Sequence, residues 1–315
     1  MADEKKSHKK HRHGRKKKKW VRWVVGIIAV ILLVNIAIAG KFYLDAKKAV
    51  DNTYKAVKHE NKRSSKVSLS KGQPFSVLLL GTDTGEYGRT EQGRSDTIMV
   101  AAVTKNKTQL LSIPRDTLVT IAGYSGNNKI NAAYAYGGVT GAVNTIQNYL
   151  DIPIDHYIEI NMKGLEQLSA AIGSVKVEND LDFTNMGIHF PKGEVTINSS
   201  NILAYTRMRY EDPRGDYGRQ LRQRMVVTAL VQKAASINSI TKYQSILNAI
   251  SSNVKTDLTF DDIKDILANY SEAKNIEQVQ LKGTSETIDG VSYEVVSQEN
   301  LAKVQKLLKS ALNVK

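Results

Sequence analysis

One long apolar run near the N-terminus most constrains how this chain can fold. Residues 23–39 are apolar apart from Asn35. Their number is close to the lower limit of the roughly 17–25 residues that a helix needs to cross the hydrocarbon of a bilayer. The preceding residues 1–19 hold ten lysines and arginines against two acids. Because basic flanks stay on the cytoplasmic side, we expect 1–19 to be a cytoplasmic tail, 20–40 a transmembrane anchor, and the remaining chain extracellular.

A cleaved signal peptide is the alternative interpretation of the same run. Ala37-Ile38-Ala39 resembles an A-x-A cleavage site. However, the apolar run is longer than the usual signal-peptide core of roughly 7–15 residues, which favours an uncleaved anchor. Both interpretations place the body of the chain outside the cytoplasm.

The charge distribution argues against nucleic acid as a partner. The whole chain carries a net charge of +14, and the tail at residues 1–19 supplies +8 of it. The high isoelectric point therefore describes the tail more than the body. The chain contains no cysteine, which excludes disulfides, thiolate catalysis and cysteine-ligated metals. His156 and His189 are the two histidines beyond the tail and the stretch that follows the apolar run, so a histidine-built zinc site is not favoured.

Strand and helix patterns alternate from Pro74 onward, after a polar, lysine-rich segment at 41–73 that we interpret as a helical stalk and linker. This alternation predicts an α/β fold, with a mixed central β-sheet flanked by helices, over residues 74–315. Strands are expected at 75–80, 97–103, 109–113, 157–160, 175–177, 195–197, 276–281 and 291–296. Helices are expected at 131–150, 163–172, 200–206, 218–236, 242–253, 260–271 and 299–312.

The positions of the arginines are the strongest chemical signal in the body. Residues 205–224 contain six arginines and no lysine, whereas residues 225–315 contain ten lysines and no arginine. The planar guanidinium binds phosphate oxygens in pairs and keeps its charge when partly buried. The sequence therefore predicts phosphate binding. The alternative is a set of structural ion pairs with Glu211, Asp212 and Asp216.

The spacing of these arginines favours convergence on a ligand. Arg207 and Arg209 share a face if the backbone between them is extended. Arg219, Arg222 and Gln223 stand at positions i, i+3 and i+4 of a predicted helix and share one face of it.

Two aspartates at neighbouring strand ends suggest a metal. Asp83 follows the first predicted strand, and Asp96 enters the second, two residues after Arg94. Magnesium is typically held by one or two carboxylates together with substrate phosphates. The alternative is that Asp83 caps a turn and Asp96 pairs with an arginine. A further couple, Arg115-Asp116, stands where the third strand ends.

Seven segments of the chain form a recognisable set. They are Gly81–Asp83, Arg94–Asp96, Ser112–Asp116, Lys129–Tyr134, Leu203–Arg209, Gly215–Arg219 and Arg222-Gln223. Taken together, these segments resemble the LytR–CpsA–Psr family. The resemblance is collinear over a motif core at 74–235, and residues 236–315 resemble the C-terminal extension of its wall-teichoic-acid-type members. The short stretch between Asp180 and Ile202 departs from the family pattern.

The resemblance implies a Mg²⁺-dependent phosphotransferase of the Gram-positive envelope. Such an enzyme moves a glycopolymer phosphate, of teichoic acid or capsule, from an undecaprenyl-pyrophosphate carrier to peptidoglycan, and the carrier's lipid tail would lie in an apolar groove. Asp83 and Asp96 would hold the metal. Arg115, Arg219 and Asp96 are the expected catalytic residues, with Asp96 or Asp116 as the candidate base. The expected pyrophosphate ligands are Arg94, Arg115, Lys129, Arg207, Arg209, Arg219 and Gln223, to which the helical spacing adds Arg222.

Two other functions remain open on the sequence. A polyprenyl-pyrophosphate hydrolase or lipid-binding module would use the same arginines, with water or nothing as the acceptor. A membrane-bound transcriptional attenuator would need a DNA-binding element in the cytoplasm. The tail at 1–19 offers charge but no helix that reads bases.

Overall fold

The computed structural model describes most of the chain beyond the predicted anchor. The predicted tail and all of the predicted anchor except Gly40 lie outside the described residues. Within the described residues, no helix combines the length and apolarity that a membrane span requires. Those residues are 40–58, 60, 62–63, 65–83, 93–236, 246 and 253–314.

The chain divides into two compact units, Met1–Lys47 and Lys48–Lys315. In the first unit, residues 40–47 are helical. The second unit begins before the predicted domain boundary at residue 74. Its early residues Val67 and Leu69 are buried against Phe75, so this part of the predicted linker belongs to the packed domain.

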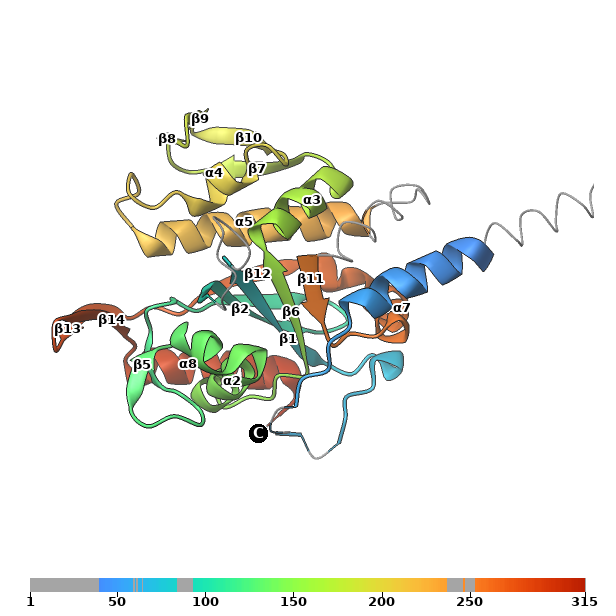
Figure 1. Ribbon diagram of the computed structural model, residues 1–315, viewed down its shortest axis with the longest axis horizontal. Helices are drawn as coiled ribbons and strands as arrows, with labels where there is room; N and C mark the ends of the chain where they lie inside the picture. The colour runs from blue at the N-terminus through green and yellow to red at the C-terminus, as the bar shows by residue number, and fades with distance from the viewer. Residues whose placement is uncertain are drawn as a thin grey trace, which may run out of the picture. The chain divides into compact units, whose positions relative to one another are not determined.

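A six-stranded mixed sheet forms the centre of the second unit (Figure 1). This confirms the predicted sheet flanked by helices. Strand β1 is parallel to β6 and antiparallel to β2, while β3 is antiparallel to β2 and parallel to β12. In spatial order the strands are β11 (Val254–Thr256), β6 (His156–Asn161), β1 (Phe75–Thr82), β2 (Ser95–Val103), β3 (Thr108–Ser112) and β12 (Ile276–Gln280).

These strand directions gather several chain segments at one edge of the sheet. The carboxyl ends of β1, β3, β6 and β12 lie there together with the start of β2. Ligands of open sheets with parallel strands bind outside such carboxyl ends. The Asp83, Asp96 and Arg115 that the sequence singled out all lie at this edge.

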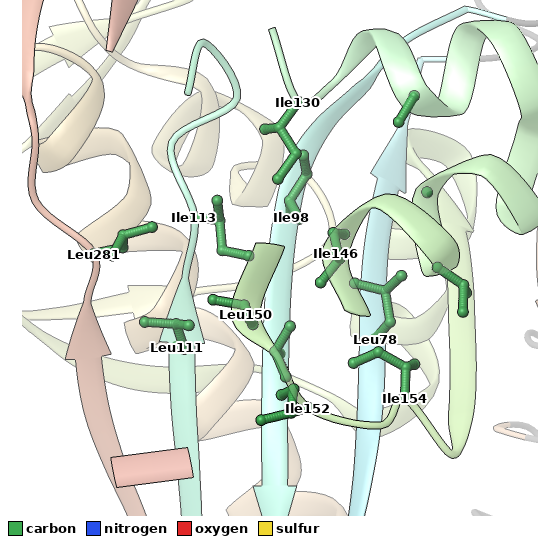
Figure 2. Packing of buried hydrophobic residues seen from close by; sticks show 14 of the residues in the cluster. Leu78, Ile98, Leu111, Ile113, Ile130, Ile146, Leu150, Ile152, Ile154 and Leu281 are labelled. Carbon is green, nitrogen blue, oxygen red and sulfur yellow. The ribbon is translucent and has the colours of Figure 1, made fainter. Parts of the chain in front are cut away.

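One face of the sheet is covered by α2 (Ala132–Leu150) and α8 (Gln298–Leu312) (Figure 1). Successive side chains of a strand point to opposite faces, so Leu78 and Leu80 of β1 share this face. Figure 2 shows Ile146 and Leu150 of α2 packed over Leu78 and its neighbours on β2 and β3. A helix from the C-terminal extension is thus part of the main core.

The opposite face is covered by α7 (Phe260–Asn269) and by Val227 of α5 (Asp216–Ala235). Helix α7 begins with a capping box between Thr259 and Asp262, which satisfies backbone donors at its first turn. Short 3-10 helices, η1 (Leu69–Lys71) and η2 (Ser271–Lys274), flank this layer.

A second hydrophobic cluster lies beyond this layer and packs against α5, whose first turn lies at the sheet edge. Its centre is an aromatic group in which Phe183 stacks on Phe190 at 5.0 Å and Tyr205 packs against both rings. The elements that build it are α3 (Met162–Ile172), β7 (Val175–Asn179), β8 (Phe183–Asn185), β9 (Ile188–Phe190), β10 (Gly193–Ile197), α4 (Ile202–Arg207) and α5.

Two further hairpins complete the unit. One pairs β4 (Leu118–Thr120) with β5 (Asn127–Lys129), and the other pairs β13 (Thr284–Ile288) with β14 (Val291–Val295). The sequence did not predict β4, β5, β8, β9, β11 or β13, and most of the expected helix at 242–253 lies outside the described residues. Helix α2 runs past Gly137-Gly138 as predicted, but Gly138 has φ 59° and ψ −149° and kinks it.

A buried ion pair anchors the first turns of α5. Arg222 and Asp212 are fully buried and lie 2.6 Å apart. Arg222 also donates to the Met208 carbonyl at 2.7 Å, and Arg214 donates to Asp212 from Nε at 2.8 Å. A Cβ at Gly218 would lie 1.8 Å from the Asp212 carboxylate, so only glycine permits this approach. The carboxylate therefore ties α5 to the loop that precedes it.

The ionised form of Asp212 is stabilised in the folded protein. Burial alone would raise the pKa of Asp212, but hydrogen bonds from Arg214 and Arg222 outweigh it and lower the pKa to about 2. An unfolded aspartate titrates near ~3.9. Because the folded pKa is the lower one, the stabilisation is present above about pH 4 and is lost as the pH falls toward about 2.

We therefore expect Asp212→Asn to lower the free energy of unfolding by about 3–5 kcal/mol at pH 7, because Arg222 keeps a buried, unpaired charge. The half-exposed Asp180 also pairs with Arg214, and the control Asp180→Asn should cost less than about 1 kcal/mol. Urea unfolding at pH 7 and between about pH 2 and pH 5 measures both effects. An Asp212→Asn protein as stable as the wild type at pH 7 would contradict the assignment.

Candidate active site

A β-bulge presents Asp96 at the sheet edge. The ladder between β1 and β2 pairs Gly81 with Thr97 and then Thr82 with Ser95. Asp96 is therefore the extra residue that no partner opposes. Bulges locally bend a strand and re-aim a side chain, and they are frequent next to active sites. The sequence placed Asp96 at a strand start but gave no sign of the bulge.

Arg115 lies directly beside this aspartate. Strand β3 ends next to the start of β2, and the loop after it brings Arg115 Nη1 to 2.9 Å from Asp96 Oδ1. Its Nε lies 3.7 Å from Asp116 Oδ2 and 4.0 Å from Asp216 Oδ1. Burial tends to lower the pKa of Arg115, but Asp96 and the other two carboxylates outweigh it and raise the pKa. Arg115 is thus a permanent cation held among three aspartates.

Helix α5 brings a second guanidinium to the same place. Arg219 is 8% exposed, and its Nη2 lies 2.5 Å from Asp216 Oδ1 and donates to the Asp96 carbonyl at 3.4 Å. Burial lowers the pKa of Arg219, and the nearby positive charges of Arg115 and Arg209 lower it further, against the effect of Asp216. Such mutual repulsion favours the binding of an anion between the arginines.

Several buried polar atoms around these arginines have no hydrogen-bond partner among the described residues. They include Nε of Arg115, Nε of Arg219 and Oε1 of Gln223. The Nε2 of Gln223 makes one long hydrogen bond, 3.4 Å, to the Thr206 carbonyl. Buried donors in folded proteins nearly always have an acceptor. Among the described residues Arg222 Nε also lacks an acceptor, but Arg115 and Arg219 share Asp216 Oδ1 at the sheet edge, and their two Nε donors together make this the candidate position for ligand oxygen atoms.

The other predicted binding residues differ in their contacts with this centre and in their exposure. Lys129, at the end of β5, lies 2.9 Å from Asp116 Oδ1. Arg207 is exposed at the end of α4, and Arg209 is half-buried two residues later. Met208 between them is buried and extended, with φ −57° and ψ 134°. Arg94 is exposed and immediately precedes β2 at the same sheet edge.

Arg222 does not belong to this group, and its predicted role in phosphate binding is corrected here. An α-helix turns by about 100° per residue, so positions i+3 and i+4 fall on opposite sides of position i. Relative to Arg219, this turn takes Gln223 toward the Thr206 carbonyl of α4 and Arg222 into the second hydrophobic cluster, where Asp212 binds it. The shared-face argument overlooked this divergence.

Some of the ion pairs of the alternative interpretation are present among the arginines at 205–224, and Arg219 itself pairs with Asp216. Arg214 and Arg222 pair with Asp212. Arg224 is buried and donates to Gln280 Oε1 at 2.6 Å, and burial lowers its pKa to about 10. The arginines at 205–224 therefore have two roles. Some make the buried polar contacts that hold α5 in place, and others form the cluster at the sheet edge.

Asp216 is the site residue that the sequence undervalued. It appeared only as a possible structural partner, yet it lies between Arg115 and Arg219. The predicted helix began at residue 218, whereas α5 begins at Asp216, so Asp216 and Arg219 stand at positions i and i+3 of one helix and their side chains meet.

Asp83 and Asp96 at the sheet edge are the candidate ligands of a magnesium ion whose remaining ligands a substrate would supply. Asp83 directly follows β1, and Asp96 lies at the start of β2, which pairs with β1. A Cβ at Gly93 would lie 2.2 Å from Asp83 Oδ1, so glycine leaves the room that this carboxylate occupies. Among the described residues, no three or more histidine, cysteine or acidic side chains form a metal-binding group. Two carboxylates are enough for magnesium when phosphate oxygens and water complete its coordination shell.

Comparison with known proteins finds relatives that match most of this chain. A teichoic acid transferase, TagU of Enterococcus faecalis, is 49% identical over 286 residues, which cover 90% of this chain and 94% of the relative. The crystal structure of Bacillus subtilis TagU is 40% identical with a TM-score of 0.62, covering 77% of this chain and 98% of that one. The structure titled "TagT bound to LI-WTA" is 30% identical with a TM-score of 0.70, covering 82% and 98%.

The model of one protein family also matches nearly all of the described chain. The match extends over residues 40–310 and thus includes the motif core and most of the C-terminal extension. Together with the relatives' identity and coverage, it confirms the resemblance seen in the sequence. This chain belongs to the LytR–CpsA–Psr family.

Proposed function

We propose that this chain is a phosphotransferase that moves a glycopolymer phosphate from an undecaprenyl-pyrophosphate carrier to peptidoglycan. The observation that carries the proposal is the pair of guanidiniums, Arg115 and Arg219, whose buried Nε donors have no acceptor among the described residues. A pyrophosphate offers the oxygen atoms that would satisfy both. The relatives' printed name, polyisoprenyl-teichoic acid–peptidoglycan teichoic acid transferase, supports the same donor and acceptor.

The chemistry needs charge neutralisation more than a covalent nucleophile. Phosphoryl transfer is catalysed mainly by positioning and by stabilising charge on the transferred group. An acceptor hydroxyl would attack the phosphorus on the glycopolymer side, and the bond to the carrier phosphate would break, releasing polyprenyl phosphate. Arg115 and Arg219 would neutralise the pyrophosphate, and Asp96 and Asp216 hold these guanidiniums in place.

The remaining cations of the cluster would bind the rest of the pyrophosphate and the sugar phosphate. Lys129 and Arg209 lie near the two central arginines, while Arg94 and Arg207 are exposed at the edge. Gln223, one helical turn after Arg219, has a buried side-chain oxygen without a partner among the described residues. The proton of the acceptor would pass to Asp96 or to Asp116, both of which are partly accessible.

Asp83 and Asp96 would hold a magnesium ion, which neutralises developing charge on phosphate oxygens. Both carboxylates come from strand ends that pair with each other. Asp96 also contacts Arg115, so the same carboxylate would link the metal to the arginine cluster.

Substitution of arginine by lysine tests the proposed phosphate contacts. Lysine keeps the charge but loses the planar fork. A charge-assisted hydrogen bond contributes about 1.5–3 kcal/mol, so Arg115→Lys, Arg207→Lys and Arg219→Lys should each slow transfer about 10- to 150-fold. The assay follows labelled glycopolymer that becomes covalently attached to peptidoglycan. Lys306→Arg, at an exposed position of α8, is the control and should leave the rate unchanged.

Thermal melts accompany these assays, because a lost ion pair would lower stability and rate together. Transfer within about twofold of the wild type in all three arginine variants would refute bidentate phosphate contacts at these positions. Release of polyprenyl phosphate and soluble glycopolymer phosphate, without attachment to peptidoglycan, would instead identify a hydrolase.

The magnesium proposal predicts that Asp83→Asn and Asp96→Asn each lose most transfer activity while the protein remains folded, because a neutral amide does not balance the charge of the metal. Treatment with EDTA should have the same effect on the wild type, and added Mg²⁺ should restore it. A double variant that still transfers glycopolymer in EDTA would show that these carboxylates are structural.

We also propose that the domain lies outside the cell membrane, anchored at residues 20–40 with the tail at 1–19 in the cytoplasm. The charge asymmetry around the single apolar run supports this topology. Protease added to intact cells stripped of their wall should degrade the body of the chain. A body that stays protected until the membrane is permeabilised would exclude both this location and the proposed acceptor.

A further inference from the structure

The β13–β14 hairpin of the C-terminal extension reaches the loop that carries Arg115. The backbone N–H of Glu294, in β14, donates to the Asp116 carbonyl at 2.9 Å. The same residue forms a parallel β-bridge with Thr117. The arginine-bearing loop is therefore held from its outer side by a residue far along the chain.

The side chain of the same glutamate reaches the start of α5. The hydroxyl of Tyr217 donates to Glu294 Oε1 and accepts from the backbone N–H of Gly283 at 2.8 Å. Tyr217 directly follows Asp216 and stands two residues before Arg219. Burial raises the pKa of Tyr217, and the hydrogen bond to Glu294 raises it further, so the phenol keeps its proton and remains a donor.

The base of the hairpin is tightly packed, so the hydrogen bonds of Glu294 can hold the Arg115 loop and the start of α5 relative to each other. A Cβ at Gly283 would lie 2.6 Å from the Val295 carbonyl oxygen and 3.1 Å from Glu294 Oε1. The neighbouring Tyr293 faces Lys129, whose Nζ lies 5.9 Å from the ring centroid. By contrast, β13 is exposed along its whole length. The contacts with the site are thus concentrated at the base of the hairpin and on β14.

We propose that Glu294 is a positioning residue that sets the distance between the two arginine-bearing segments, the Arg115 loop through its backbone and the first turn of α5 through Tyr217. Arg115 and Arg219 would thereby be held where both contact one pyrophosphate. The inference rests on the proposed function, because it concerns the geometry of the same site. Misplacement of catalytic groups by about 1 Å can cost about 100-fold in rate, so a tether of this kind matters.

The test uses the full-length chain in detergent and four single variants. Glu294→Ala removes the acceptor, Glu294→Gln keeps an oxygen that accepts from the phenol, and Tyr217→Phe removes the donor. Glu286→Ala, an exposed glutamate on β13 of the same hairpin, is the matched control. Calorimetry measures the Kd of geranyl pyrophosphate, a soluble probe of the pyrophosphate site, and the transfer assay gives kcat and KM.

We expect Glu294→Ala and Tyr217→Phe each to weaken probe binding and to lower kcat/KM about tenfold, the size of one lost hydrogen bond to a charged group. Glu294→Gln should stay within about threefold of the wild type, and Glu286→Ala should be unchanged. The double variant Glu294→Ala/Tyr217→Phe should be no worse than either single variant, because both changes break one connection.

The outcomes separate this inference from the proposed function. If Arg115→Lys weakens probe binding but Glu294→Ala and Tyr217→Phe do not, the positioning role is wrong and the proposed function stands. Additive effects in the double variant, or equal losses in Glu294→Ala and Glu294→Gln, also overturn the role. If Glu294→Ala does not fold, the contrast between Glu294→Gln and Tyr217→Phe decides. A wild-type chain that does not bind the probe refutes the proposed function itself.

Discussion

The arrangement of two arginines around shared aspartates is the interaction on which the candidate site depends. Arg115 and Arg219 repel each other, and they remain close because Asp96 and Asp216 lie against them. The aspartates neutralise the guanidiniums only in part, and within the described part of the chain two Nε donors are left without acceptors. The site is thus organised before a substrate arrives, and electrostatic preorganisation of this kind is usually the largest contribution to catalysis.

The remainder of the domain maintains this arrangement from three directions. The sheet supplies Asp96 at a bulge and Arg115 just after β3, so both positions follow from strand pairing. The buried pair of Arg222 and Asp212 fixes the rotation of α5 about its axis, and hence the direction of Arg219. The base of the β13–β14 hairpin contacts both segments from outside. These supports come from separate parts of the sequence and meet only in the folded chain.

The sequence predicted the features that depend on local pattern. The periodicity of apolar residues predicted the long strands and the main helices. The use of arginine in place of lysine indicated Arg115 and Arg219 as candidate binding residues. Strands of three residues, such as β4 and β8, are too short for alternation to identify them. The role of Arg222 depends on a buried carboxylate ten residues away, and the contacts of Glu294 depend on tertiary structure. No local pattern contains either piece of information.

The pairing of β12 with β3 has a consequence for how the domain is made. The two strands are parallel neighbours although about 170 residues separate Thr108 from Ile276, and α8, which completes the core over α2, follows later still. Contacts between such distant residues slow folding, because a long loop must close before they form. Until the last part of the chain emerges during synthesis, β3 is an edge strand with unpaired backbone groups, which other chains can join. The part of the sheet that carries the candidate site, at the carboxyl ends of β3 and β12, is therefore among the last parts of the protein to be completed.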